Sequence, residues 1–386
     1  MSDARTMILK MLADGKITVE ESERLLAAIK DENKSEAASS SQQYEQEKES
    51  QKNSYENFDP FGVGFDLRNI AKNVQQTINQ TMKKTEPRSK EFKEKMKEFG
   101  NWMQDMMGTM ANEFAHNRAE PKDAISVDFI VPLPEAISQL KKLSLENVFG
   151  EIRVKTGDEP KMKVTGRIGQ SVMGEYQPAQ WFSKYALNQE NDELAVAFDK
   201  SLNIKAILDI DVTLPEDMCV SCKTLSSDIR IRGKIDVDEL KTVSGNIRVM
   251  GAMLKDSKIE SVSGDVQVEG GEIAMEIKST SGDFIVRESK INELKITSVS
   301  GDILLAEASV TDDTKVKLIT TSGDIMVEKI TGPWKLVEAL TRTGDIMLDW
   351  RGDVTPINNR GTQLKSGTEE GAKFKAESVS GDIQFI

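Results

Sequence analysis

The two cysteines of the chain stand close together, in the stretch Cys219-Val220-Ser221-Cys222. A pair at this spacing binds zinc when a second pair is near, or forms a redox disulfide when it opens a helix. The chain has no second pair, and residues three apart in a strand point to opposite faces of a sheet. Cys222 also falls at a repeat position that elsewhere holds leucine or isoleucine. The sequence therefore predicts a buried thiol rather than a metal or redox site.

Aspartate recurs directly after glycine in a short motif, Ser-Gly-Asp followed by isoleucine or valine. Aligned on this motif, the carboxylates form one column, made up of Asp228, Asp265, Asp283, Asp302, Asp324, Asp345 and Asp382. Stacked carboxylates in the turns of a repeat protein can bind calcium. Each aspartate can equally hydrogen-bond the backbone of its own turn, and the glycine-rich nonapeptide of calcium-binding rolls is missing. We therefore expect no cofactor, with calcium at this column as the alternative.

Catalysis would need a base, a group that orients it and a defined cleft. The single histidine, His116, lies outside the motif region and has no evident partner in the sequence. Solenoid enzymes that act on polysaccharides gather carboxylates on one face, but the uniform repetition of the Asp column is typical of architecture. The sequence therefore predicts no catalytic residue, and a carbohydrate-active solenoid enzyme is the alternative.

The elements that position these residues are copies of one unit. The motif glycines follow one another at steps of 18 to 22 residues, at Gly245, Gly264, Gly282, Gly301, Gly323 and Gly344, and Gly381 belongs to the last copy. Weaker copies precede them, around Ser227 and Gly150. A period of this size indicates structural units that stack on one another.

Apolar residues alternate around each motif glycine. Isoleucine, valine, leucine or phenylalanine stands two and four residues after it, and serine or threonine stands three residues before it. This alternation predicts a strand, a tight turn and a second strand with one apolar face, and glycine permits a positive φ at the corner. One unit cannot bury its apolar face alone, but stacked units can. The expected fold class is α+β, mainly β: a right-handed β-solenoid over residues 122–386, preceded by a helical hairpin and amphipathic helices.

Charge and hydropathy limit the partners and the location. The formal net charge of −13 argues against nucleic acid as a partner, because phosphates need a basic surface. Neither a signal peptide nor an apolar run of about 18 residues is visible. We therefore expect the protein in the cytoplasm or peripherally at the membrane, with surface exposure by an unconventional route as the alternative.

Three segments precede the repeat domain. Residues 1–30 predict a helical hairpin, in which Thr18 and Glu21 form a capping box. Residues 31–57 hold almost no large apolar side chain, which is typical of a disordered linker. Residues 58–118 return to the helical period and predict amphipathic helices.

A methionine-rich stripe marks the second half of this helical segment. It follows a heptad spacing and consists of Phe92, Met96, Phe99, Met103, Met106 and Met110, widened by Trp102 and Met107. Methionine-rich faces adapt to variable partners, and a helix with such a face can lie in a membrane interface. We predict that these residues bind a protein or peptide, a membrane partner or surface, or a second copy of the chain. The alternative is that the stripe packs on the preceding helix or on the β-domain.

An insertion at residues 155–217 interrupts the repeat and carries Tyr176, Trp181, Phe182 and Tyr185. An aromatic cluster in this place caps the end of a solenoid core more often than it binds a ligand. We expect a cap, with a ligand surface as the alternative.

Two features together resemble a known family: the serial Ser-Gly-Asp-Ile turns, and residues 7–21 with the sequence MILKMLADGKITVEE. They are similar to the YvlB/LiaX-type proteins of Gram-positive bacteria, whose β-repeat domain is named after adhesins and has no known function. The resemblance implies a non-enzymatic protein of the cell-envelope stress response, linked in some members to antimicrobial peptides and membrane partners. We therefore expect a scaffold or sensor whose helical region binds a membrane protein, the membrane surface or a cationic peptide. A surface adhesin or a carbohydrate-binding solenoid is the alternative.

Overall fold

The computed structural model describes residues 123–386 apart from 132, 134–139, 199–205, 217, 349–353, 357–362 and 367–370. The chain divides into two compact units, residues 1–58 and 59–386, and every described residue belongs to the second unit. Three predicted segments lie outside the described residues: the helical hairpin over residues 1–30, the linker over 31–57 and the amphipathic helices over 58–118.

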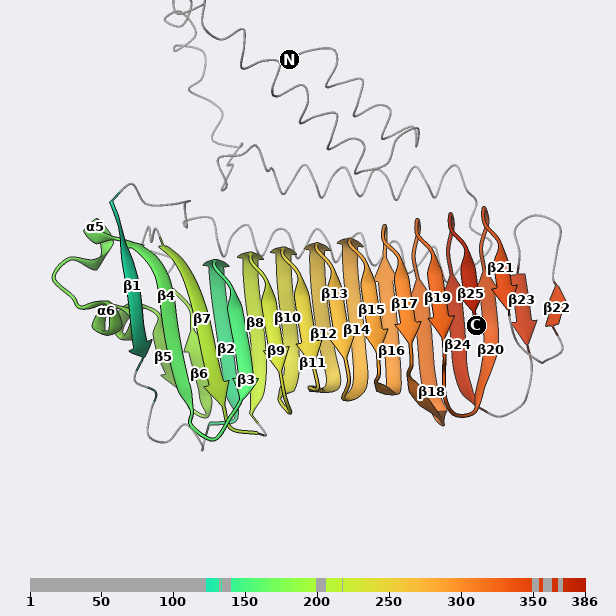
Figure 1. Ribbon diagram of the computed structural model, residues 1–386, viewed down its shortest axis with the longest axis horizontal. Coiled ribbons are helices and arrows are strands. Elements are labelled where there is room, and N and C mark those ends of the chain that lie inside the picture. Colours follow the sequence, from blue (N-terminus) through green and yellow to red (C-terminus); the bar gives the residue numbers. More distant parts are fainter. Residues whose placement is uncertain are drawn as a thin grey trace, which may run out of the picture. The chain divides into compact units, whose positions relative to one another are not determined.

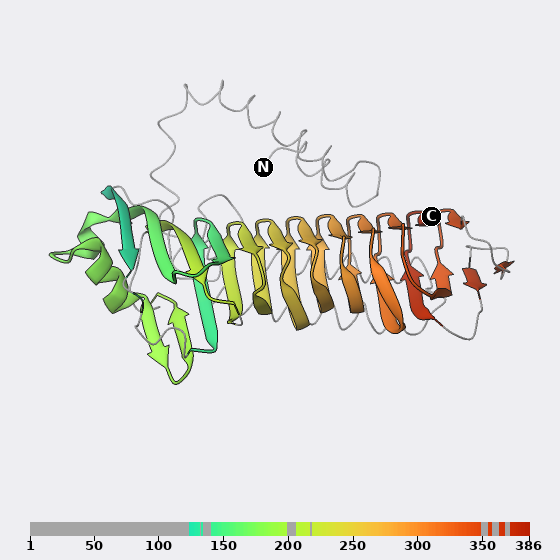
Figure 2. The same cartoon turned by 60° about the horizontal axis from the view of Figure 1, so that its bottom comes forward.

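Two sheets of mostly parallel strands build the repeat domain (Figures 1 and 2). In each coil, a long strand of one sheet leads through a tight corner into a short strand of the other; the corner residue is glycine except between β8 and β9, where it is Ser227. The long strands are β2 (Lys142–Phe149), β8 (Cys219–Ser226), β10 (Asp236–Ser244), β12 (Met253–Ser263), β14 (Glu272–Ser281), β16 (Lys290–Ser298), β18 (Ser309–Ile319), β20 (Trp334–Leu340) and β24 (Ala372–Glu377). The short strands are β3 (Ile152–Thr156), β9 (Ile229–Arg232), β11 (Ile247–Met250), β13 (Val266–Glu269), β15 (Phe284–Arg287), β17 (Ile303–Ala306), β19 (Ile325–Glu328), β21 (Ile346–Leu348) and β25 (Ile383–Phe385). The expected fold class, a mainly β solenoid of stacked strand-turn-strand units, is confirmed.

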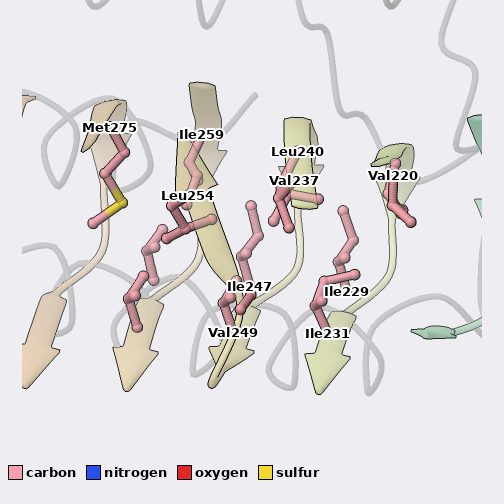
Figure 3. Close-up of a cluster of buried hydrophobic side chains, with 14 of the residues drawn as sticks. Val220, Ile229, Ile231, Val237, Leu240, Ile247, Val249, Leu254, Ile259 and Met275 are labelled. Carbon is pink, nitrogen blue, oxygen red and sulfur yellow. The ribbon is translucent and has the colours of Figure 1, made fainter. Parts of the chain in front are cut away.

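The hydrophobic core lies between the long-strand sheet and the short-strand sheet (Figure 3). In the coil of Gly245, Leu240, Ile247 and Val249 point into it, and each is 1% exposed or less. Ile247 stands between Ile229 and Val266 of the neighbouring coils, so the inward side chains form continuous columns. Burial of one such side chain stabilises the fold by about 1.5–3 kcal/mol, which is why the inward positions stay apolar in every coil.

The corner glycines stack directly on one another. Gly264 has a φ of +130°, and Gly282 has a φ of +115°. A Cβ on Gly264 would lie 2.1 Å from the carbonyl oxygen of Gly245, and one on Gly282 would lie 2.3 Å from that of Gly264. Both the backbone conformation and the neighbouring coil therefore exclude a side chain here.

Buried hydroxyl groups line the inner side of the same corner. Ser298 Oγ donates a hydrogen bond to the carbonyl oxygen of Ser300 at 3.0 Å, and Thr341 Oγ1 donates to that of Gly381 at 2.9 Å. In these coils the bond joins the end of the long strand to the corner. At the same position in the coils of Ser227, Gly245 and Gly264, the hydroxyls of Thr224, Thr242 and Ser261 are buried without a hydrogen-bond partner in the described part of the chain.

The insertion closes the N-terminal end of the solenoid. Strand β4 (Lys161–Gly169) pairs with β7 (Ala206–Leu214) and with β1 (Ala124–Val131), and β7 continues the short-strand sheet beside β3. The hairpin of β5 (Leu187–Glu190) and β6 (Glu193–Val196) continues the long-strand sheet beside β2. Between β4 and β5 lie α5 (Gln170–Met173) and α6 (Pro178–Tyr185). No helix in the described part of the chain is long and apolar enough to cross a membrane.

The last coil lies out of sequence order at the C-terminal end. Strand β24 pairs with β18 on one side and β20 on the other, and β25 likewise lies between β19 and β21. The coil of Gly381 therefore stacks on that of Gly323, and the coil of Gly344 lies outermost. The chain between them contributes β22 (Val354–Pro356) and β23 (Gln363–Ser366), and β23 runs antiparallel to both β22 and β20.

Candidate interaction surface

The two cysteines occupy β8 with different burial. Cys222 is fully buried in the core and Cys219 is half-buried, and both are free thiols. Burial raises the pKa of both thiols, so both are protonated at neutral pH and are poor nucleophiles and poor metal ligands. The predicted buried thiol at Cys222 is confirmed.

The aspartates of the motif form a hydrogen-bonded column on the surface. Asp265 Oδ1 accepts a hydrogen bond from the backbone N–H of Asp283 at 3.0 Å, and Asp283 Oδ1 accepts one from that of Asp302 at 2.9 Å. The same bond joins Asp324 to the N–H of Asp382 at 2.7 Å. The sequence predicts that each aspartate caps its own turn; in the structure it caps the turn of the next coil, because stacking brings that N–H within reach.

Six aspartates of the column thus use one carboxylate oxygen inside the fold, namely Asp228, Asp265, Asp283, Asp302, Asp324 and Asp382. Among the described residues, no three His, Cys, Asp or Glu side chains gather closely enough to hold a metal ion. The absence of a cofactor, and calcium at the column as its alternative, both stay predictions.

The outward side of the short-strand sheet carries side chains that change from coil to coil. We call the side chains three residues after each corner the face row. In order along the solenoid, the face row consists of Arg153, Arg230, Arg248, Gln267, Ile285, Leu304, Met326, Gln384 and Met347. The inward neighbours on the same strands stay apolar throughout. The constant inward side chains serve the fold, so the changing outward ones determine what the surface can bind.

Cations gather in the N-terminal half of the face row. Arg230 lies directly opposite Arg248, and both are exposed. Like charges in this position destabilise a sheet, and neighbouring carboxylates offset part of the charge. Arg153 forms ion pairs with Glu151, Asp209 and Asp211, and Arg230 forms them with Glu151 and Asp228. Arg232, two residues after Arg230 on β9, is also exposed. This half of the face row is basic on a chain of net charge −13, and it is suited to a carboxylate, sulfate or phosphate group.

Apolar side chains follow in the C-terminal half. Ile285, Leu304 and Met326 stand opposite one another on β15, β17 and β19 and are partly exposed. Met347, at the end of the face row, is 56% exposed. Gln384 interrupts the apolar stretch, because the last coil is inserted before that of Met347. Exposed apolar side chains in a row on a flat sheet are typical of a surface that binds another molecule.

The aromatic cluster of the insertion behaves as the expected cap. Trp181 and Phe182 on α6 are 1% and 0% exposed and belong to the core. The ring centroid of Phe182 is 5.8 Å from those of Phe129 and Phe198. Tyr176 is 39% exposed, and its hydroxyl accepts a hydrogen bond from Lys184 Nζ at 2.6 Å. The rings of Trp181 and Phe182 therefore cover the end of the core and are not available to a ligand.

The residues predicted to bind partners lie outside the described residues, and so does His116. These are Phe92, Met96, Phe99, Trp102, Met103, Met106, Met107 and Met110, and their role stays a prediction. The face row was not among the predicted sites, although its signal is present in the sequence. The residue three positions after each glycine changes from arginine to apolar types along the chain while its neighbours keep their character.

Two family models match the sequence. The model described as Toastrack DUF4097 matches residues 140–385, and the model described as SHOCT-like domain matches residues 4–34. No curated protein matches the chain.

Several solved structures are similar to the solenoid. A "putative adhesin" from Bacteroides fragilis shares 16% identity, covers 69% of this chain and 99% of its own, and has a TM-score of 0.40. A "putative cell adhesion protein" from Clostridium sporogenes shares 12% identity over 67% of this chain and 98% of its own, with a TM-score of 0.21. A "putative lipid binding protein" from Parabacteroides distasonis shares 9% identity over 70% of this chain and 100% of its own, with a TM-score of 0.34.

Proposed function

We propose that this chain, which belongs to the Toastrack DUF4097 family, is a non-enzymatic binding scaffold of the adhesin type, and that the face row is its contact surface. One observation supports the proposal. Along the short-strand sheet the inward side chains keep their character, whereas the outward ones change from Arg230 and Arg248 to Ile285 and Leu304. Repeat proteins build extended binding surfaces in this way.

The partner that fits the face row is long and of mixed chemistry. From β3 to β21 the row crosses eight strand spacings of about 4.8 Å, or about 38 Å. Arg230 and Arg248 can each donate two parallel hydrogen bonds to an anionic group, and Ile285 and Leu304 can contact an adjoining apolar part. An anionic polymer at a cell surface has this combination of length and chemistry.

The absence of catalysis is part of the proposal. Asp302 and Asp324 each accept a hydrogen bond from the next coil, which gives the column a role in the fold. Asp302→Asn and Asp324→Asn should therefore change only the stability. A carbohydrate-active enzyme that used this column would instead lose its hydrolysis of polysaccharide in both variants.

The envelope-stress role implied by the YvlB/LiaX-type resemblance depends on the helical region, which lies outside the described residues. It stays a prediction. The adhesin interpretation is favoured here because its contact surface lies on the described solenoid. Protease treatment of intact cells separates the two: an adhesin is cleaved from outside, whereas a protein in the cytoplasm or at the inner membrane surface is protected.

Whole-cell binding tests the contact surface. Beads that carry the full chain are mixed with bacterial cells, and the bound fraction is counted. Arg230→Glu with Arg248→Glu, and separately Ile285→Glu with Leu304→Glu, should weaken binding by about tenfold or more. Lys255→Glu with Lys290→Glu makes the same charge change at two exposed positions of the long-strand sheet and should leave binding unchanged. An equal loss in all three variants, or no loss in any, contradicts the proposal.

A further inference from the structure

Burial stops alternating where each long strand meets its corner. In β10, Leu240 is buried and Lys241 is only partly buried, as alternation requires, but Thr242 and Val243 are both buried. In β12, Ser261 and Val262 are likewise both buried. Six apolar side chains therefore lie on the outward side of the long-strand sheet and are buried nevertheless. We call them the outer row, and they are Val148, Leu225, Val243, Val262, Val299 and Ile319. The first five stand two residues before their corner, and Ile319 stands four residues before its own, opposite Thr297.

The outer row is separate from the core between the sheets. None of its side chains belongs to the core cluster, yet Val243 is 1% exposed and Ile319 is 0% exposed. Outward apolar side chains on the other sheet are different, since Met347 is 56% exposed. In the part of the chain that the structure describes, α5 packs on β4, and α6 packs on β1 and β5, so neither helix covers this row. Full burial on the outward side of a sheet requires a covering element.

We propose that the methionine-rich segment of the same chain, from Phe92 to Phe114, packs along the outer row. Its length fits. As a helix, the stretch from Phe92 to Met110 is about 27 Å long. From β2 to β18 the outer row crosses six strand spacings of about 4.8 Å, or about 29 Å. One helix face can therefore contact all six side chains of the outer row.

The connection to the solenoid sets the direction of the segment. Nine residues lie between Phe114 and Ala124 at the start of β1, and the ten Cα–Cα steps across them reach about 33 Å when fully extended. Strand β1 lies three strand spacings beyond β3, about 14 Å from the coil that holds Val148. Phe114 can therefore lie over β2. With Phe114 over β18, the connection would have to cross about 43 Å, so the segment runs with Phe92 toward the C-terminal end.

Packing of this kind would place the predicted partner-binding stripe on the solenoid. Met96, Phe99 and Met103 would then contact the outer row instead of a membrane or a second protein. A partner that binds the stripe would have to displace it, and Val243 and Val262 would become exposed. The outer row and an external partner would therefore compete for the methionine-rich stripe.

Hydrogen exchange of the full chain, followed by mass spectrometry, tests the docking. Amides between Phe92 and Phe114 should exchange at least about tenfold more slowly than in an unstructured chain. Val243→Glu with Val262→Glu should remove this protection, and so should Met103→Glu with Met106→Glu. The second variant changes only the segment, so β10 and β12 should keep their slow exchange. Ile285→Glu with Leu304→Glu, on the opposite sheet, is the matched control and should leave the segment protected.

Three results overturn the proposal. The first is exchange of the segment at the unstructured rate in the unaltered protein. The second is loss of protection in Met103→Glu with Met106→Glu but not in Val243→Glu with Val262→Glu, because the stripe would then pack on another helix. The third is protection that rises with protein concentration, which would show docking onto a second copy.

Discussion

At both ends of the solenoid the core needs side chains that cover it, and the two ends are covered by different elements. At the N-terminal end, α6 lays Trp181 and Phe182 across the core, where they are 1% and 0% exposed. At the C-terminal end, Trp334 packs on Phe374 and Phe385 with ring centroids 5.5 and 5.9 Å apart, and Trp334 stays partly exposed. At the N-terminal end, the inserted helix α6 covers the core. At the C-terminal end, the coil of Gly381 lies between those of Gly323 and Gly344. Phe374 and Phe385 are therefore buried, and the coil of Gly344 is outermost.

The edge strands of the short-strand sheet also differ between the two ends, in their length. Strand β1 has eight residues at the N-terminal edge of the short-strand sheet, and β21 has three at the C-terminal edge. Short edge strands limit unwanted pairing with other chains. The hairpin of β22 and β23 covers the C-terminal edge of the long-strand sheet. The hairpin of β5 and β6 does the same at the N-terminal edge of that sheet, so the two ends differ in the edge strand of the short-strand sheet and in how the core is covered.

Removal of the tryptophan at each end gives the largest expected difference. Trp181→Ala empties a fully buried site and should lower the free energy of unfolding by about 3–5 kcal/mol. Trp334→Ala removes a partly exposed ring and should cost about half as much. Denaturant unfolding followed by circular dichroism measures both losses. If the two substitutions destabilise the chain equally, the C-terminal end is closed as completely as the N-terminal end.

A methyl group at a corner glycine tests how firmly each end holds its coils. A Cβ would lie 2.1 Å from Ser227 O in Gly245→Ala and 2.2 Å from Gly381 O in Gly344→Ala, so the contact is equally close in both. The coil of Gly245 is held by neighbours on both sides, and the variant should lose about 3 kcal/mol or more. The coil of Gly344 has a neighbour on one side only and can shift, so about 1 kcal/mol is expected.

Gly251→Ala is the control for these two substitutions. Gly251 also has a positive φ, of +70°, but nothing lies within 4 Å of the added Cβ. This variant should show only the cost of the backbone conformation, about 1 kcal/mol. Thermal unfolding of all three variants should place Gly344→Ala near Gly251→Ala and far from Gly245→Ala. The opposite order would show that the outermost coil cannot adjust.

The repeat could be predicted from the sequence because its cause is local. Gly264 and Gly282 occupy corners that accept no side chain, and the alternation around them fixes which residues point inward. The aromatic cap could be predicted for the same reason, since Trp181 and Phe182 stand in the one segment that breaks the period. In both cases neighbouring residues in the chain carry the whole signal.

The order of the coils could not be predicted, because it depends on contacts between distant residues. The coils of Gly344 and Gly381 carry the same motif, and either could stack on the coil of Gly323. The structure places Gly381 there, so that Phe374 and Phe385 are buried and Trp334 packs against them. The partner of each aspartate was missed for a similar reason, since the acceptor and the donor lie in different coils.

Loss of a column carboxylate should have a smaller and more local effect. Asp228 Oδ1 accepts the N–H of Asn246 at 2.9 Å, and Asp382 Oδ1 accepts that of Asp345 at 2.8 Å. Asp228→Ala acts on a coil held from both sides and should lower the global stability by about 1 kcal/mol. Asp382→Ala should leave the global stability almost unchanged and speed hydrogen exchange at Asp345. Equal effects on global unfolding would show that the outermost coil unfolds together with the rest.

The smallest expected effect is a dependence on pH that differs in sign between the ends. At the C-terminal end, burial raises the pKa of Glu377. The folded chain then holds a proton that the unfolded chain has lost, so this carboxyl favours folding below the raised pKa and disfavours it above. At the N-terminal end, Lys142 Nζ donates to Asp238 Oδ2 at 2.7 Å, and this bond lowers the pKa of Asp238. Its contribution is present above the ordinary aspartate pKa and is lost as the pH falls through the lowered value.

Two substitutions separate these contributions. As the pH falls from 7 toward the ordinary glutamate value, Glu377 should raise the melting temperature, and Glu377→Gln should remove that rise, an effect of about 1 kcal/mol or less. Asp238→Asn should leave the rise intact and instead weaken the loss of stability at lower pH. Thermal unfolding across this range measures both. If Glu377→Gln leaves the pH dependence unchanged, Lys375 alone holds Glu377 ionised, and burial at the C-terminal end does not control its charge.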